Sequence, residues 1–191
     1  MSSRTVTFCG IPTGIWFSDA GSIMEITLHL DVTPEEFFDL LARNVAKDIE
    51  DATGKTVPTS KFNGYRYEKV VRQGRLRSEM KVRIKSYQPP KRYAVRFTTS
   101  QGETSIVYEA EPVASGGIDV TYTEEYKPTN PGFGLNRRLG ELRYNFKVRE
   151  RAKKTLPAME KYIKQERRLK AEGIDLDATG EDDAEGSDAK Q

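Results

Sequence analysis

The stretch that decides the fold is RLRSEMKVRIKSY, residues 75–87, in which apolar and charged side chains alternate. Its apolar positions are Leu76, Met80, Val82 and Ile84, and its charged positions are Arg77, Glu79, Lys81, Arg83 and Lys85. Successive side chains of a strand point to opposite faces. The alternation therefore predicts a strand with one buried face and one wet face.

The same alternation of apolar and polar residues is found on both sides of this strand in the sequence. It predicts further strands at residues 65–72, 92–99, 103–111 and 118–126. Turn-forming residues separate these segments, at Gln73-Gly74, Gln88-Pro89-Pro90, Gln101-Gly102 and Ser115-Gly116-Gly117. Such short connections predict an antiparallel meander of five strands.

A strand and a helix are predicted before the meander. Residues 23–31 alternate in the same way, with the even-numbered positions apolar. Thr33 is suited to cap a helix, Pro34 suits its first position, and Glu36 completes a capping box. Gly54 is predicted to end this helix.

A long amphipathic helix is predicted after the meander, from about Leu135 to Leu169. Two apolar stripes are expected to face the sheet, Leu135, Leu139, Leu142 and Phe146 first, then Leu156, Met159 and Ile163. Pro157 is expected to kink or restart the helix. A continuous helix would be about 50 Å long. Its C-terminal end is therefore expected to overhang the sheet into solvent.

These elements predict an α+β fold, a curled antiparallel sheet of about six strands gripping a long C-terminal helix. Residues 23–170 form the predicted domain. Residues 1–22 are expected to be an irregular arm, and residues 171–191 a disordered acidic tail. The regular pattern opens at Met24, so a translation start there is an alternative to Met1.

The order of elements, together with MEI at residues 24–26 and DVTPEEFF at residues 31–38, resembles the START-like (SRPBCC) helix-grip superfamily. The resemblance covers residues 24–169 and is strongest to an uncharacterised bacterial branch known only as a domain of unknown function. It implies an apolar cavity between sheet and C-terminal helix. Superfamily members variously carry lipids, cyclise polyketides or act as chaperone partners. No shared catalytic motif exists to transfer, so no catalytic residue is predicted.

Residues that break the apolar pattern of the strands, or that fill the gap between the two helix stripes, are the candidates for a binding site. They are Lys69, Ser78 and Glu124 on the strands and Asn145, Arg149 and Ala152 in the gap between the helix stripes. Inward-facing tyrosines can add hydroxyl groups, so the predicted ligand-binding residues also include Tyr93, Tyr108 and Tyr122. Tyr65 and Tyr67 belong to the same tyrosine set. The alternative is a β-bulge, or long side chains reaching solvent at the sheet edge.

The charge distribution is strongly asymmetric. Residues 135–170 carry a net charge of +9 and residues 171–191 a net charge of −7, within a total of +2. Eleven of the thirteen cations in residues 135–170 are the candidates for a binding surface, namely Arg137, Arg138, Arg143, Lys147, Arg151, Lys153, Lys154, Lys161, Lys164, Arg167 and Arg168. They suit an acidic partner, phospholipid head groups or nucleic acid, with a merely solvated helix face as the alternative. No aromatic residues interleave with the basic residues of the sheet, so no specific nucleic-acid binding is predicted.

The single cysteine and single histidine exclude most metal and nucleophilic schemes, so no metal and no cofactor are expected. One cysteine forms no internal disulfide, which favours the cytoplasm. No apolar stretch is long enough for a membrane span.

Three functions remain open from the sequence. The first is a module that binds a hydrophobic small molecule or lipid, and the second is an interaction or regulatory protein that uses the basic helix. The third, a cyclase-like or hydrolase-like enzyme, requires Glu124 and Arg149 to lie within hydrogen-bonding reach of each other in an open pocket.

Overall fold

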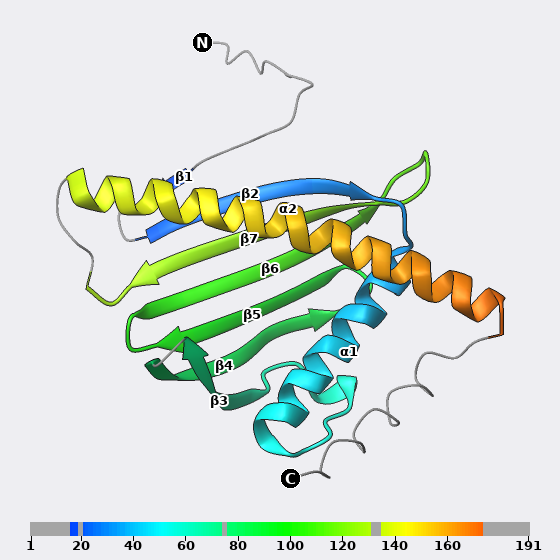
Figure 1. The fold of residues 1–191 in the computed structure, drawn as a ribbon, viewed down its shortest axis with the longest axis horizontal. Coiled ribbons are helices and arrows are strands. Elements are labelled where there is room, and N and C mark those ends of the chain that lie inside the picture. Colours follow the sequence, from blue (N-terminus) through cyan, green and yellow to red (C-terminus); the bar gives the residue numbers. More distant parts are fainter. Residues whose placement is uncertain (1–15, 19–20, 74–75, 131–134, 174–191) are drawn as a thin grey trace, which may run out of the picture.

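The computed structural model describes residues 16–18, 21–73, 76–130 and 135–173, and its elements follow the predicted order (Figure 1). They are β1 (Trp16–Ser18), β2 (Gly21–Leu30), α1 (Pro34–Thr53), a 3₁₀ turn η1 (Thr59–Lys61), β3 (Arg66–Gln73), β4 (Leu76–Gln88), β5 (Arg92–Thr99), β6 (Gly102–Pro112), β7 (Ile118–Pro128) and α2 (Leu135–Ala171). The predicted α+β fold is confirmed. The short β1 is an addition, because it pairs with β2 inside the arm expected to be irregular. The rest of the arm, residues 1–15 and 19–20, and all but the start of the acidic tail lie outside the described residues.

All strands form one antiparallel sheet in the order β1-β2-β7-β6-β5-β4-β3. The first long strand therefore pairs with the last, and Met24 lies opposite Glu124. The register shifts only between Ile84 and Ser86 of β4 within the described pairs. We call the face that carries the helices the inner face and the opposite face the outer face.

Local signals determine α1. The Thr33 Oγ1 accepts a hydrogen bond from the Glu36 N–H, and the Glu36 carboxylate accepts one from the Thr33 N–H, at 3.2 and 2.8 Å. Gly54 ends the helix in the left-handed conformation, with φ of 67°. The buried stripe, which packs over the inner face, is Phe37, Leu41, Val45 and Ile49.

The helix α2 is continuous through Pro157, so the helix does not restart there. The proline leaves the carbonyl of Lys153 without its usual donor, and both residues are exposed, so water can bind there. The buried row consists of Asn145, Val148, Ala152, Leu156 and Ile163, and α2 packs along β2. The first predicted stripe is wrong where it is described, because Leu142 and Phe146 are 52% and 67% exposed.

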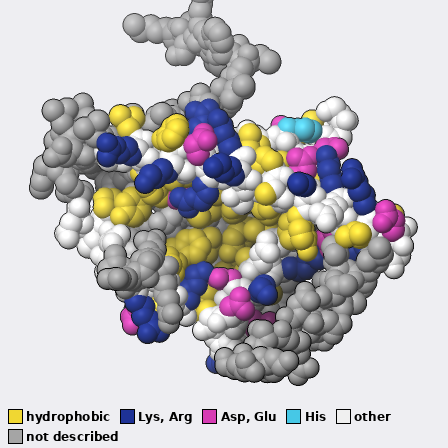
Figure 2. Space-filling view, viewed as in Figure 1, with side chains coloured by type: hydrophobic (Ala, Val, Ile, Leu, Met, Phe, Trp, Pro, Cys, Tyr) yellow, Lys and Arg dark blue, Asp and Glu magenta, His cyan; other side chains and the backbone are white. Residues whose placement is uncertain are grey.

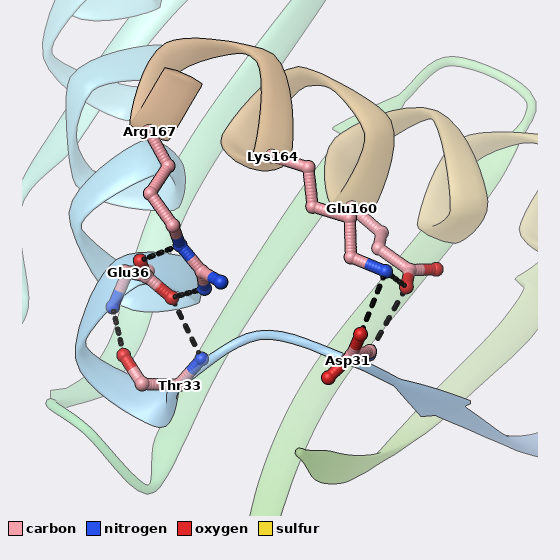
Figure 3. Close-up of polar contacts among 6 residues, drawn as sticks. All are labelled: Asp31, Thr33, Glu36, Glu160, Lys164 and Arg167. Carbon is pink, nitrogen blue, oxygen red and sulfur yellow. Dashed lines mark hydrogen bonds and ion pairs between the residues drawn. The ribbon is translucent and has the colours of Figure 1, made fainter. Parts of the chain in front are cut away.

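The C-terminal part of α2 docks on α1 instead of overhanging into solvent (Figure 3). Arg167 donates two hydrogen bonds to Glu36, at 2.9 and 2.7 Å, and Lys164 pairs with Asp31 at 3.0 Å. Further along α1, both terminal nitrogens of Arg43 donate to Glu166, at 2.6 and 2.7 Å. We call these ion pairs, together with the buried Ile163 of α2, the α1–α2 clamp.

The two helices leave the middle of the inner face partly open. In Figure 1, α2 lies towards β2 and β7 while α1 crosses near β3 and β4, and β5 and β6 run between them. Figure 2 shows apolar side chains at the bottom of the hollow between the helices. The apolar side chains of this face that remain partly exposed include Met80, Phe97, Ile106 and Tyr108.

Candidate functional site: a tyrosine-lined groove

A row of tyrosines crosses the inner face from strand to strand. Tyr87 of β4 lies opposite Tyr93 of β5, Tyr93 opposite Tyr108 of β6, and Tyr108 opposite Tyr122 of β7. The ring centroids are 6.4, 6.4 and 5.1 Å apart in that order. Directly opposed residues of antiparallel strands share one face, so the register itself aligns these rings. We call them the tyrosine row.

A buried carboxyl group lies at the β7 end of the tyrosine row. Glu124 is 1% exposed and accepts hydrogen bonds from the hydroxyls of Tyr122 and Tyr144. The Arg151 Nη1 lies 3.7 Å from its Oε2. The Tyr144 ring stacks on Tyr126 at 5.0 Å, which fixes its position over the sheet. We call Glu124, Tyr122, Tyr144 and Arg151 the Glu124 cluster.

Burial keeps the hydroxyls of this region protonated. It raises the pKa of Tyr108 to about 12, with the charge of Glu124 adding to the effect. Burial and then the neighbouring Glu124 also raise the pKa of Tyr122 and of Tyr144. These side chains are therefore neutral hydrogen-bond donors at ordinary pH.

A second polar cluster flanks the open floor on the side of α1 and β3. Asp48 of α1 accepts hydrogen bonds from the Lys69 Nζ at 2.6 and 2.7 Å and also from the Tyr67 hydroxyl. Burial, followed by the hydrogen bond to Asp48, raises the pKa of Tyr67. The Lys69 Nζ lies 6.0 Å from the centroid of the Phe97 ring. The charge of Lys69 is thus neutralised while its stem lies on the apolar floor.

The structure brings some of the candidate residues together and separates others. Tyr93, Tyr108, Tyr122 and Glu124 are contiguous across β5, β6 and β7. Ser78 is half-buried opposite Val71, with no hydrogen bond to another described residue. Because the pairing runs in register through Lys69, Ser78 and Glu124, a bulge does not explain their inward positions.

On α2, Asn145 and Ala152 are buried as expected for sheet-facing residues, at 6% and 2% exposure. The Asn145 Oδ1 is buried and has no hydrogen-bond donor among the described residues. The expected inward position of Arg149 is wrong, because Arg149 is exposed and Val148 takes the buried position. Adjacent helix residues differ by about 100° around the axis, so only one of the two can face the sheet. The cation beside Glu124 is Arg151.

Four residues of the site escaped prediction, Asp48, Tyr87, Tyr144 and Arg151. Asp48 lies one turn beyond Val45 on the buried stripe of α1, so its position offered a signal. Tyr144 and Arg151 are seven residues apart, two helical turns, and hence lie on the same side of α2. Which side of α2 meets Glu124 depends on how the helix docks, and no local pattern determines that.

Two pockets lie between the helices. A cleft of about 720 Å³ is lined by Leu40, Arg43, Asn44, Lys47, Lys154, Thr155, Ala158, Met159 and Tyr162. A pocket of about 510 Å³ is lined by residues of the α1–α2 clamp and its surroundings, where the main charges already pair with each other.

Within the described ranges, no three His, Cys, Asp or Glu side chains are grouped to hold a metal ion. None of the described helices is both long and apolar enough to cross a membrane.

The curled sheet and the long helix across it define a helix-grip protein of the START-like (SRPBCC) fold. More specifically, the chain belongs to the family described as a domain of unknown function, DUF3284, whose model matches residues 24–145. None of the curated proteins matches this chain.

Solved structures share the fold at low sequence identity. The Zhui aromatase/cyclase from Streptomyces sp. R1128 is 16% identical with a TM-score of 0.54, over 80% of this chain and 98% of that one. Ara h 8.0201 is 12% identical with a TM-score of 0.52, over 75% and 97% of the two chains. The di-domain StfQ, an ARO/CYC protein from the steffimycin biosynthetic pathway, is 12% identical with a TM-score of 0.57, over 78% of this chain and 52% of StfQ.

Proposed function

We propose that this protein binds a hydrophobic small molecule or lipid in the groove over the inner face, between α1 and α2. The observation that carries the proposal is the partly open floor, where apolar side chains and Tyr108 remain partly exposed beside the buried Glu124. Binding sites for small molecules are typically apolar hollows with a few convergent polar groups. Two proteins with the same fold, Zhui and StfQ, are aromatase/cyclase proteins, which is in keeping with a small-molecule ligand.

The polar groups of the floor favour a ligand with its own hydrogen-bonding group. No hydrogen bond joins the hydroxyl of Tyr93 or of Tyr108 to another described residue, and both tyrosines have a raised pKa caused mainly by burial. They can therefore donate to a carbonyl or hydroxyl oxygen of a ligand. The oxygens of Glu124 already accept from Tyr122 and Tyr144, so we assign Glu124 to holding those tyrosines in place.

Filling the groove should weaken binding. The variant Ile106→Trp adds bulk on the inner face of β6, whereas Val107→Trp adds the same bulk on its outer face. We expect Ile106→Trp to weaken binding of an apolar fluorescent probe, N-phenyl-1-naphthylamine, by at least about tenfold, which corresponds to about 1.4 kcal/mol. Val107→Trp should bind the probe as the wild type does.

Native mass spectrometry of protein purified from its own host gives an independent measurement. The wild type and Val107→Trp should carry an apolar species that Ile106→Trp lacks. The proposed groove would be contradicted if the wild type did not bind the probe, or if both variants lost binding to the same extent.

A second candidate function rests on a row of cations along the outward side of α2. Lys147, Lys154, Lys161 and Arg168 follow one another at seven-residue intervals, and all are exposed. Seven residues are close to two helical turns, so these side chains form one nearly straight row. No ion pair found in the described part of the chain involves them, whereas Arg151, Lys153, Lys164 and Arg167 have acidic partners. Such a row supports contact with an acidic partner.

The acidic tail offers a test of this candidate. Removal of residues 174–191 deletes seven acidic residues and one basic residue, so we expect the truncated protein to elute from heparin at higher salt. The triple variant K147Q, K154Q and K161Q should elute at lower salt. The control triple variant K55Q, K61Q and K91Q removes the same charge from exposed positions away from α2. Equal elution of the two triple variants would show that total charge, and not the row, determines retention.

A further inference from the structure

The outer face carries three arginines side by side. Arg66 of β3 lies opposite Arg83 of β4, and Arg83 lies opposite Arg96 of β5. The Cβ atoms of directly opposed residues are about 4.5–5.5 Å apart, and like charges in such pairs are destabilising. We call these residues the arginine row.

Several other cross-strand pairs on the outer face are complementary, although Arg72 lies opposite Arg77 and Glu111 opposite Asp119. Arg92 is paired with Glu109, which lies directly opposite it, and His29 forms a hydrogen bond of 2.9 Å with Asp119, also directly opposite. Lys81 likewise pairs with Glu68 at 3.7 Å. The arginine row differs from these pairs because it places like charges side by side on three consecutive strands.

The surroundings of the arginine row add positive charge. Lys85, at the register shift of β4, has its pKa lowered mainly by the charges of Arg83 and Arg96. Glu103 is the acidic residue that faces the row, with its Oε1 3.2 Å from the Arg96 Nε. Among the described residues, no ion pair involves Arg66 or Arg83. The row therefore has a clear excess of positive charge.

The arginine row also contains donors without acceptors. The Nε atoms of Arg83 and Arg96 are buried and have no hydrogen-bond partner in the described part of the chain, since Glu103 lies outside hydrogen-bonding geometry with Arg96. A buried donor left unpaired costs roughly 1–3 kcal/mol. The Arg96 Nε has the Glu103 carboxylate nearby, whereas the Arg83 Nε has no ion-pair partner among the described residues, so a further negatively charged acceptor would satisfy Arg83 in particular.

We propose that the arginine row binds a phosphate-type oxyanion on the outer face of the sheet, across β3, β4 and β5. Guanidinium groups present several N–H donors in a planar fork that matches the oxygens of a phosphate. Ser105, directly opposite Arg96, adds a hydroxyl beside the row. The same chemistry is offered by free phosphate and by the phosphoryl group of a larger molecule. The site is on the opposite side of the sheet from the groove and does not depend on it.

Thermal unfolding tests the proposal, with inorganic phosphate and glycerol 3-phosphate as probes and chloride at equal ionic strength as the reference. At a phosphate concentration ten times the Kd, the wild-type Tm should rise by about 3–6 °C. Arg83→Gln should have a higher Tm than the wild type in chloride, because a like-charge contact is removed, and should lose the response to phosphate. Arg92→Gln, the control on the same face, should have a lower Tm in chloride and keep the full response.

The two probes separate the two sources of the anion. A response to both supports a site for free phosphate, and a response to glycerol 3-phosphate alone supports a site for a phosphorylated molecule. Arg66→Gln, at an exposed position of β3, provides a second variant that should also lose the response. The absence of a response to either probe beyond that of chloride, or a full response in both Arg83→Gln and Arg66→Gln, would overturn the proposal.

Discussion

The variant Leu156→Ala is expected to lower the free energy of unfolding by about 2–5 kcal/mol. Leu156 is fully buried in the middle of the row with which α2 packs on the sheet. Its truncation removes apolar contact and leaves a cavity that the sheet can fill only in part. Alanine and leucine have similar helix propensities, so the loss reports on packing and not on helix formation. Urea denaturation measures it.

A matched control exists on the same helix. Leu142 is 52% exposed, so Leu142→Ala makes the same chemical change where little contact is lost. Surface substitutions usually change stability by no more than about 0.5 kcal/mol. Equal losses in the two variants would mean that α2 presents a different side to the sheet, and the position of Arg151 beside Glu124 would then be wrong as well.

The fold could be predicted because its signals are local. The capping box at Thr33 and Glu36 and the left-handed Gly54 determine where α1 begins and ends, and they act within a few residues. Alternation along each strand determines which side chains face inward, and short hairpins determine which strands are neighbours. The observed β5, Arg92–Thr99, has the predicted bounds for this reason.

The rotation of α2 could not be predicted in the same way. Extending the apolar spacing from Leu142 and Phe146 leads to Arg149, whereas the buried row includes Val148 and Ala152. Contacts distant in the sequence determine which side of α2 faces inward, namely the Glu124 cluster at one end and the α1–α2 clamp at the other. A helix with many long charged side chains has a weak apolar pattern, so these contacts override it.

The candidate site was predictable in part for a related reason. Tyr93, Tyr108 and Tyr122 face inward by alternation, but their contact with one another requires the register of three strands. The polar partners Asp48 and Arg151 are on helices, and their pairing with the sheet depends on docking geometry. The strands' contribution to the site could therefore be predicted more completely than that of the helices.

Acid is expected to release the α1–α2 clamp. The hydrogen bonds from Arg43 hold the pKa of Glu166 at about 2, well below its usual value near 4.5. A carboxyl group whose pKa is lowered by folding stabilises the fold above its unfolded pKa, and the contribution disappears as the pH falls toward the folded pKa. The Glu166 side chain is 10% exposed and that of Arg43 is 41% exposed, so solvent weakens the pair. We expect a contribution on the order of 2 kcal/mol, lost between about pH 4.5 and pH 2.

The variant Glu166→Gln isolates this contribution. At pH 7 it should be less stable than the wild type by on the order of 2 kcal/mol, and the two curves should converge as the pH approaches 2. Glu150→Gln is the control, at a half-exposed position of the same helix. Its free energy of unfolding should follow a pH curve parallel to that of the wild type. Asp31, Glu36 and Glu160 also have lowered pKa values, caused by Lys164, Arg167 and Lys164 respectively. Both the wild type and Glu166→Gln should therefore lose further stability in acid through these other carboxyl groups. The convergence of the two stability curves, and not the total loss, measures the contribution of the Arg43–Glu166 pair. A difference between wild type and Glu166→Gln that stays constant from pH 7 to pH 2 would show that the glutamine disturbs packing and that the ion pair contributes nothing.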